Sequence, residues 1–381
     1  MDEITHKALL PAGLRDALPE EAGREAEAVY RLTRSFRDRG YQTVKPPLLE
    51  FEESLLTGPG AELAPQLFRL MDPISQKMMG LRADITPQIA RVAATRLVGE
   101  PRPLRLCYSG QVLRVKGDQL RPERQFTQAG IEMFGATSVH ADAEIVLMTV
   151  AALRACGVAE IAIDLTIPSL APLVLNGRGF DRLSAAAARD ALDGKDAGEL
   201  RSVIGEDPVV FTLLEAVGPA EPAIERLLAL GLQGHAGELI GRLADLLDAI
   251  REVEPDLPLT VDPGEYRGFE YQTGVAFAVF SPRVRGEIGR GGRYVTESGE
   301  PAVGATIYLD SLLRALPAQA PRPRLYLPFG TPHAVAAALR GGDWAVVAGL
   351  DPEGDPLAEA RRLKCGHVRI DGTIRPVDPV R

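Results

Sequence analysis

Two polar side chains, Gln128 and Glu132, stand out in a stretch that otherwise has the pattern of a buried strand. Residues 104–136 contain two apolar runs separated by Lys116–Gln119, which predicts a long antiparallel hairpin. Because alternate residues of a strand face the same side, Gln128 and Glu132 share a face on either side of Gly130. A glycine inside a strand often marks a close approach to the backbone. The pattern therefore indicates a polar ligand site, and a half-exposed sheet face in water is the alternative.

Two further stretches carry polar residues of matching character. Asp84 and Thr86 stand at the start of a helix predicted over residues 86–96, beside its free backbone N–H groups. Simple capping by Thr86 is the alternative to a binding role. Arg267 and Tyr271 are expected to point the same way on one strand, and the fixed fork of donors on arginine suits a small carboxylate or phosphate.

Composition excludes several classes of function. A net charge of −9 provides no general field for gathering nucleic acid. The three cysteines are widely spaced and form no metal-binding motif, so we expect a reducing, cytoplasmic setting. With five histidines and no His/Cys cluster, we expect no metal site. We also expect neither a signal peptide nor a membrane span.

The order of predicted elements indicates an α+β protein. A helix from Pro19 to about Arg37 has its inward positions at a spacing of three to four residues, namely Ala22, Ala26, Val29, Leu32 and Phe36. Strands are expected near residues 41–44, 68–72, 80–84, 161–165, 259–262, 266–277 and 302–309, and helices at 142–156 and 310–316. Residues 289–294 are glycine-rich and predict a tight turn rather than an anion site.

We expect two domains. The core spans residues 1–320 and contains a helical insertion at about 169–254, between two parts of one sheet. A proline-rich break then separates a small α/β appendage at residues 321–381, which is barely long enough for a domain.

Five stretches in this order resemble the core of the class II aminoacyl-tRNA synthetases, in their histidyl branch. The stretches are Leu10–Pro47, like the dimer-forming motif 1; Leu81–Thr86, like the LRPE-G-T loop; Arg114 with Arg124–Glu132, like motif 2; and Tyr266–Gly274 and Gly291–Tyr294, like the two histidine-specific signatures. The resemblance covers roughly residues 8–316. It implies an antiparallel sheet of six or seven strands flanked by helices, in a homodimer.

Departures from the synthetase motifs fall where ATP would bind. Lys116 stands where motif 2 has a glutamate, and residues 308–311 read Tyr-Leu-Asp-Ser where motif 3 ends in Gly-x-Glu-Arg. Losing a preorganised charge that meets a developing phosphate charge raises a barrier by several kcal/mol, so we expect adenylation to fail. Gln272 and Val295 replace a tyrosine and an aspartate of the histidine signatures.

A degenerate ATP site beside a largely kept amino-acid site resembles the regulatory subunits of ATP phosphoribosyltransferase. The resemblance implies a subunit that has no catalytic residues and no cofactor. It implies that this subunit joins the short-form catalytic subunit in the first step of L-histidine biosynthesis and takes part in feedback by histidine. No tRNA is expected as a partner. The resemblance places histidine against Asp84, Thr86 and Gln128 at the α-amino group, Arg114 or Arg267 at the carboxylate, and Glu132, Tyr271 and Tyr294 at the imidazole.

Three alternatives remain at this point. An active histidyl-tRNA synthetase would exchange pyrophosphate into ATP in the presence of histidine. A histidine-binding regulator would have another partner, such as a kinase. A vestigial pocket is the third, because Gln272 replaces a tyrosine and Asp84 is one carbon shorter than the glutamate of the family.

Overall fold

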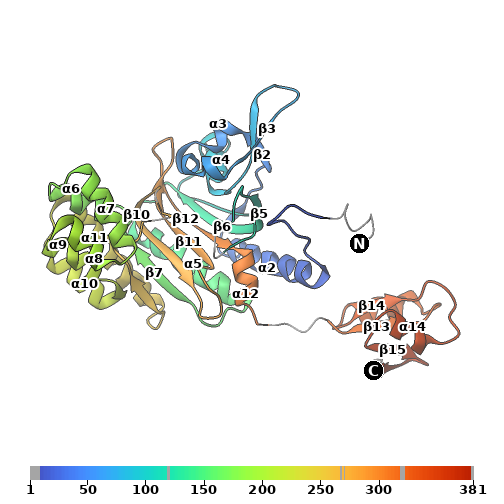
Figure 1. Ribbon diagram of the computed structural model, residues 1–381. Coiled ribbons are helices and arrows are strands. Elements are labelled where there is room, and N and C mark those ends of the chain that lie inside the picture. The colour runs from blue at the N-terminus through green and yellow to red at the C-terminus, as the bar shows by residue number, and fades with distance from the viewer. Residues whose placement is uncertain (1–8, 118–120, 267, 270, 318–321, 379–381) are drawn as a thin grey trace. The chain divides into compact units, whose positions relative to one another are not determined.

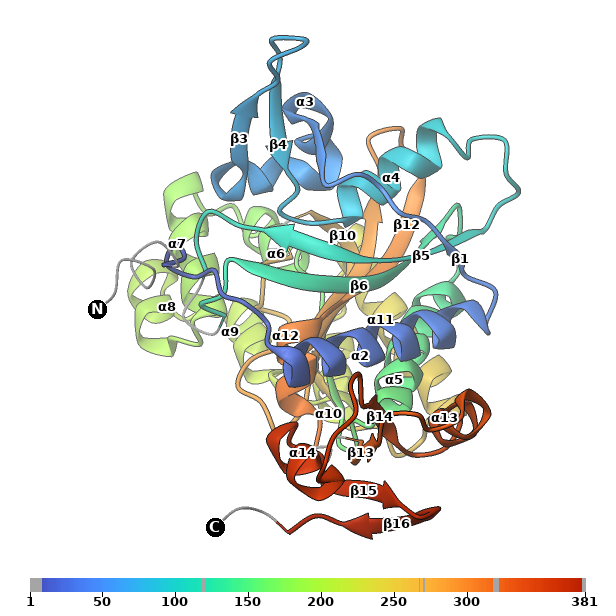
Figure 2. The ribbon, with the colours of Figure 1, turned by 90° about the vertical axis from the view of Figure 1, so that its right-hand side faces the viewer.

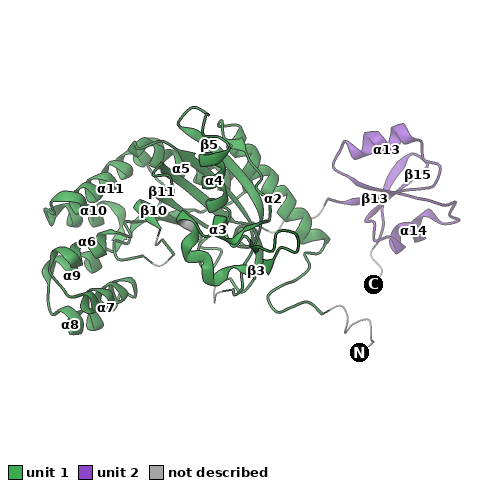
Figure 3. Cartoon of the chain, turned by 90° about the horizontal axis from the view of Figure 1, so that it is seen from above, with its two compact units in different colours: residues 1–317 green, residues 318–381 purple. Residues whose placement is uncertain are grey.

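The structure is a computed structural model that describes residues 9–117, 121–266, 268–269, 271–317 and 322–378. The chain divides into two compact units, Met1–Pro317 and Ala318–Arg381 (Figure 3). Within the described residues, no helix combines the length and the apolar character that crossing a membrane requires.

A nine-stranded sheet forms the centre of the first unit (Figure 1). Its strands are β1 (Gln42–Thr43), β5 (Leu104–Leu113), β6 (Gln125–Phe134), β7 (Ala162–Thr166), β8 (Gly218–Pro219), β9 (Leu259–Val261), β10 (Gln272–Phe280), β11 (Gly289–Val295) and β12 (Pro301–Tyr308). Neighbours in the order β5-β6-β12-β11-β10-β7 all pair antiparallel. β1 and β9 pair in parallel at either side, and β8 forms the far edge. The expected antiparallel sheet is confirmed, with short strands added at its edges.

The predicted hairpin is the pair β5 and β6. Tyr108 lies opposite Gly130 and Gly110 opposite Gln128, so the two strands pair along their whole length. The second half of the predicted turn, residues 118 and 119, lies outside the described residues. Alternate side chains of β6 enter different cores: Ile131 is buried with the helices on one face, while residues such as Phe126 are buried on the other.

Several helices pack on one face of the sheet, and Figure 2 shows three of them, α2, α5 and α12, below β5 and β6. They include α2 (Pro19–Arg37), α5 (Val139–Cys156), α11 (Gly234–Val253) and α12 (Leu309–Ala315). Proline at the first position and two acidic residues in the first turn favour the start of α2. Gly157 ends α5 with a φ of +105°, a conformation that glycine adopts without strain. Local sequence therefore sets these ends.

The inward positions predicted on α2 are only partly correct. Leu32 and Phe36 are buried, and Val29 is partly buried, but Ala22 and Ala26 are exposed. Only the C-terminal half of this helix therefore presents its predicted stripe to the core of its own chain.

The opposite face of the sheet carries α4 (Thr86–Thr95) together with a small three-stranded sheet. The small sheet has the order β2 (Leu49–Phe51), β4 (Met78–Leu81) and β3 (Phe68–Met71), and α3 (Glu52–Leu55) and a 3-10 helix, η1 (Gly58–Gln66), lie next to it. In Figure 2 these elements lie above β5 and β6. Ile85 and Ile89 are fully buried against Tyr108 and Phe134 on this face.

The chain between β7 and β9 is almost entirely helical, as expected. It forms α6 (Leu170–Gly177), α7 (Arg182–Asp193), α8 (Ala197–Ile204), α9 (Pro208–Glu215), α10 (Ala220–Ala229) and α11, with the short β8. Asp181, Asp196 and Asp207 each accept backbone N–H groups at the start of a helix, which explains why these short helices begin where they do.

The second unit has a sheet in the order β14 (Ala345–Ala348), β13 (Arg324–Leu327), β15 (His367–Ile370) and β16 (Thr373–Pro376). β13 runs parallel to both of its neighbours, and β16 is antiparallel to β15. The helices α13 (His333–Arg340) and α14 (Pro356–Arg362) complete an α/β arrangement. The strand β16 was not predicted from the sequence.

Candidate ligand-binding site

A cavity of about 260 Å³ lies on the α4 face of the large sheet. Of the eight residues predicted to bind a ligand, six line it: Asp84, Thr86, Arg114, Glu132, Tyr271 and Tyr294. Gln128 lies directly behind the lining, and Arg267 lies outside the described residues. Pockets for drug-sized molecules measure roughly 300–1,000 Å³, so this one suits a smaller ligand.

Glu132 is a buried carboxyl in this cavity. Its side chain is 1% exposed, and the Tyr294 hydroxyl donates a hydrogen bond to Oε2 over 2.9 Å. Burial raises the pKa of Glu132 to about 8, although hydrogen bonds from Tyr294 and Thr86 act in the opposite direction. Near neutral pH the carboxyl therefore holds a proton that it can share with a basic ligand.

Asp84 is fixed at the start of α4 by two neighbours. The Gln128 side-chain amide donates to its Oδ2 over 2.7 Å, and the Thr86 backbone N–H donates to its Oδ1 over 2.9 Å. The Gln128 carbonyl oxygen also accepts from the Ile85 N–H at 3.1 Å, which uses a free donor of the helix end. The amide therefore holds the carboxylate in one orientation.

Thr86 does not cap α4, contrary to the simplest expectation. It is itself the first helical residue: its backbone N–H donates to the Asp84 side chain, and the N-cap residue Ile85 makes no side-chain cap. Its hydroxyl lies 3.3 Å from the Tyr108 hydroxyl, which is 2.8 Å from Thr306 Oγ1. A Cβ at Gly130 would fall 2.4 Å from this tyrosine oxygen. The strand glycine thus accommodates a tyrosine of the same hairpin, which sequence analysis missed.

Tyr266, Gly268, Phe269 and Tyr271 do not belong to a strand, which corrects the prediction for the described part of this stretch. β10 begins at Gln272, and Gly268 has a φ of +82°. The segment turns because the Phe269 N–H donates to the Tyr266 carbonyl and the Gln272 N–H donates to the Phe269 carbonyl, both over 3.0 Å. The turn still delivers Tyr271 to the cavity, where its ring meets the edge of the Tyr294 ring at 5.7 Å.

The glycine-rich residues 289–294 form strand β11 and not a tight turn. A Cβ at Gly291 would lie 2.4 Å from the Gly304 carbonyl oxygen and 2.6 Å from the Phe277 ring, so crowding by neighbouring strands requires glycine here. Arg290 lies on this strand and lines the cavity, a residue that the turn interpretation hid.

Two further arginines lie at the cavity: Arg114 lines it, and Arg121 packs on a lining residue. Arg114 Nη2 is 4.0 Å from Asp84 Oδ2, and its guanidinium lies 5.1 Å from the centre of the Phe126 ring. The Arg121 guanidinium lies 3.8 Å from the centre of the Tyr308 ring. Sequence analysis did not single out Arg121, because its role depends on contacts with residues distant along the chain.

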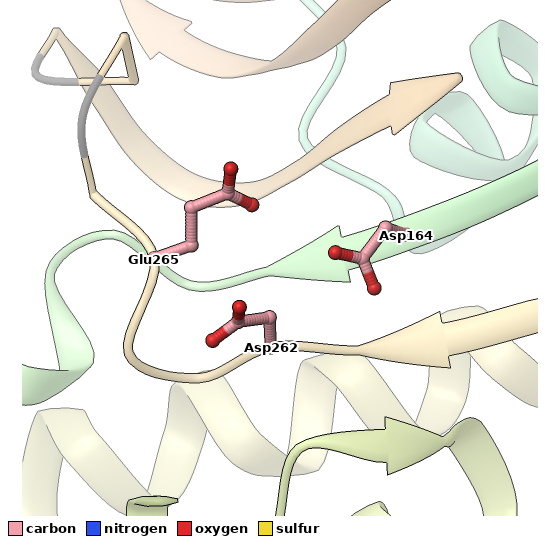
Figure 4. A group of neighbouring side chains, drawn as sticks. All are labelled: Asp164, Asp262 and Glu265. Carbon is pink, nitrogen blue, oxygen red and sulfur yellow. The ribbon is translucent and has the colours of Figure 1, made fainter. Parts of the chain in front are cut away.

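Three acidic side chains form a second cluster away from the cavity lining: Asp164 on β7, Asp262 after β9, and Glu265 (Figure 4). Their carboxylate oxygens lie within 4.8 Å of one another, close enough to hold a cation. Lys195 already supplies a positive charge, 2.6 Å from Asp262 Oδ2. Burial, followed by repulsion from the two aspartates, raises the pKa of Glu265 to about 7. The charge on Lys195 and the raised pKa of Glu265 therefore both reduce the net negative charge of the cluster.

The antiparallel sheet and the amino-acid-sized polar cavity above it define a class II aminoacyl-tRNA synthetase-like fold of the histidyl type. Residues 13–312 match the histidyl-tRNA synthetase family. A histidyl-tRNA synthetase from Nostoc superposes with a TM-score of 0.78 over 96% of this chain and 92% of its own, at 18% identity. That comparison concerns the fold alone.

The name of the regulatory subunit occurs among proteins that are more similar to this chain. A structure from Bacillus halodurans, described as an ATP phosphoribosyltransferase regulatory subunit/histidyl-tRNA synthetase, has a TM-score of 0.78 and 25% identity, covering 93% of this chain and 96% of its own. The ATP phosphoribosyltransferase regulatory subunits of Rhodospirillum centenum and Paramagnetospirillum magneticum are 50% and 52% identical, over 97% and 96% of this chain and 96% and 97% of theirs. The chain belongs to the ATP phosphoribosyltransferase regulatory subunit family.

Proposed function

We propose that this chain assembles with the short-form catalytic subunit of ATP phosphoribosyltransferase, supports the first step of L-histidine biosynthesis, and binds L-histidine in the cavity as an effector. The assembly role follows from the family. The observation that carries the effector role is a buried, proton-holding Glu132 in the same small cavity as Asp84 and Arg114. These groups supply partners for an imidazole, an ammonium and a carboxylate.

The three parts of histidine have distinct partners in this proposal. Its α-amino group meets Asp84, which Gln128 and Thr86 hold in place. Its carboxylate meets Arg114, whose planar fork can donate two parallel hydrogen bonds. Arg267, the other predicted partner of the carboxylate, lies outside the described residues.

The imidazole lies against Glu132 in this proposal. Tyr271 and Tyr294 provide aromatic surface beside this carboxyl, and they meet edge to face. An imidazole has an unperturbed pKa of about 6.5, so it exchanges a proton readily with a carboxyl whose pKa is about 8. One proton shared between the two groups stabilises the complex without leaving a charge unpaired.

We further propose that the chain forms a homodimer in the cytosol and takes no tRNA partner. The N-terminal half of α2 leaves Ala22 and Ala26 exposed, and Leu18 and Tyr30 are 68% and 58% exposed. A second copy is the simplest cover for this surface. The three cysteines are buried and unpaired, which suits a reducing compartment. Light scattering on the purified chain tests the dimer, and a monomer at micromolar concentration would refute it.

Reconstitution tests the main proposal. The short catalytic subunit is assayed alone, with this chain, and with this chain plus L-histidine. We expect activity to depend on this chain and to change with histidine.

In E132Q the histidine response should weaken while assembly persists. E144Q is the matched control, because Glu144 also accepts a tyrosine hydroxyl, from Tyr41 at 3.0 Å, but lies on α5. Robust histidine-dependent ATP–pyrophosphate exchange by this chain alone would contradict the proposal that it acts as a regulatory subunit.

A further inference from the structure

The Glu287 carboxylate, just before β11, forms ion pairs with two arginines. Arg290 donates to this carboxylate through Nε, 3.0 Å from both oxygens, and through Nη2 at 2.7 Å. Arg121 Nη2 donates to the same carboxylate at 2.9 Å. The Arg121 and Glu287 side chains are only 10% and 12% exposed. Buried charges persist only where they are paired, so this arrangement is tightly constrained.

Arg290 extends this series of contacts to the turn around Gly268 and Phe269. Its Nη1 donates to the Gly268 carbonyl at 2.5 Å, and its guanidinium lies 4.8 Å from the centre of the buried Phe269 ring. A side chain at Gly268 would collide with Arg290, because a Cβ there would be 1.9 Å from Nη1. The Arg290 guanidinium therefore packs tightly against the turn at Gly268.

We infer that Glu287 and Arg290 are positioning residues for the ligand site, because they fix the turn that presents Tyr271 to the cavity. This inference rests on the proposed histidine site. Arg290 also lines the cavity, but its hydrogen bonds among the described residues run to Glu287 and Gly268. It acts on the ligand through the turn.

Arg121 connects the same carboxylate to a second border of the cavity. It belongs to the connection between β5 and β6, and it packs on Tyr308, which lines the cavity. Through Arg121 and Arg290, Glu287 thus joins the β5–β6 connection to the turn around Gly268. Loss of the Glu287 charge releases both segments together.

The test compares R290K with R102K. Lysine keeps the charge at position 290 but has no fork to reach Glu287 and the Gly268 carbonyl together. Arg102 is the matched control: its side chain is also 24% exposed, binds Glu300 through two nitrogens and donates to backbone carbonyls, yet it does not line the cavity. Histidine binding is measured by calorimetry, and hydrogen exchange is followed at the Phe269 and Gln272 amides.

We expect R290K to accelerate exchange at these two amides and to weaken histidine binding about tenfold. This is the size of effect expected when the turn loses one charge-assisted hydrogen bond, here the one from Arg290 to the Gly268 carbonyl. R102K should change neither. E287Q should reproduce the R290K effects, and the double variant should add little, since both residues act through one contact. Weaker binding with unchanged exchange at the turn would overturn the inference and make Arg290 a direct ligand contact. If the unaltered chain binds no histidine, the proposed effector function fails. The positioning role is tested separately, because unchanged hydrogen exchange at the Phe269 and Gln272 amides in R290K would refute it.

Discussion

Gly304 on β12 lies directly opposite Glu132 on β6, and a Cβ at position 304 would fall 1.9 Å from the Glu132 carboxylate oxygen Oε2. The glycine therefore makes room for a buried carboxyl that a residue with any side chain would displace. The orientation of Glu132 in the cavity thus depends on a missing methyl group on the neighbouring strand.

We expect G304A to weaken histidine binding at least tenfold and to lower stability by about 1–3 kcal/mol, the usual cost of overpacking. Calorimetric titration and thermal unfolding measure the two effects. G99A is the control, because a Cβ at Gly99 meets nothing within 4 Å. Equal binding by G304A and the unaltered chain would show that Glu132 is not needed in its present orientation.

The pH dependence of histidine binding follows from the raised pKa of Glu132. If the complex holds one proton between carboxyl and imidazole, free Glu132 and free imidazole together carry one proton only between about pH 6.5 and about pH 8. Below that range a proton must leave on binding, and above it a proton must be taken up. We therefore expect affinity to be greatest near pH 7 and to fall on both sides.

Calorimetry in buffers of different ionisation enthalpy measures the protons exchanged on binding. In E132Q the fall should no longer begin near pH 8, and only the loss of the positive charge on the histidine α-amino group should weaken binding at higher pH. Affinity in the unaltered chain that keeps rising up to pH 9 would contradict the shared proton.

The contact proposed for Asp84 is tested with a ligand that lacks the amino group. D84N should weaken binding of L-histidine by roughly 10–100-fold, as expected for a charge-assisted hydrogen bond. It should leave the already weak binding of imidazole-propionate nearly unchanged. An equal loss for both ligands would mean that Asp84 supports the pocket without meeting the amino group.

The sequence predicted best what local periodicity and helix signals control. Strand alternation placed Gln128 and Glu132 on one face of β6, and that face is the one that meets the cavity. Proline at the start and glycine after the end located α2 closely. Such features depend on a few neighbouring residues, so they can be derived without the fold.

Tertiary contacts decided what the sequence did not reveal. The glycines of residues 289–294 have the local pattern of a turn, yet they lie in a strand because the segment pairs with β10 and β12. The segment 266–271 has a strand pattern, yet Arg290 and the positive φ of Gly268 favour a turn around Gly268. In both stretches the deciding partner is distant along the chain.

Glu265 gives a prediction about stability. Its folded pKa of about 7 exceeds the ordinary value of 4.5, because burial and then Asp262 and Asp164 disfavour the charge. The folded state therefore binds more protons than the unfolded state between these two values. Its contribution to stability is complete below about pH 4.5 and is lost as pH rises through about 7.

In E265Q this loss should be absent, so the free energy of unfolding should fall less between pH 5 and pH 8 than in the unaltered chain. K195Q should show a larger fall, because Lys195 lowers the pKa of Glu265 and its removal leaves the acids less compensated. Urea unfolding at both pH values measures the differences, and the far-ultraviolet spectrum confirms that each variant is folded. Identical pH dependence in E265Q and the unaltered chain would show that Glu265 titrates normally, because the other acids of the chain are common to both proteins.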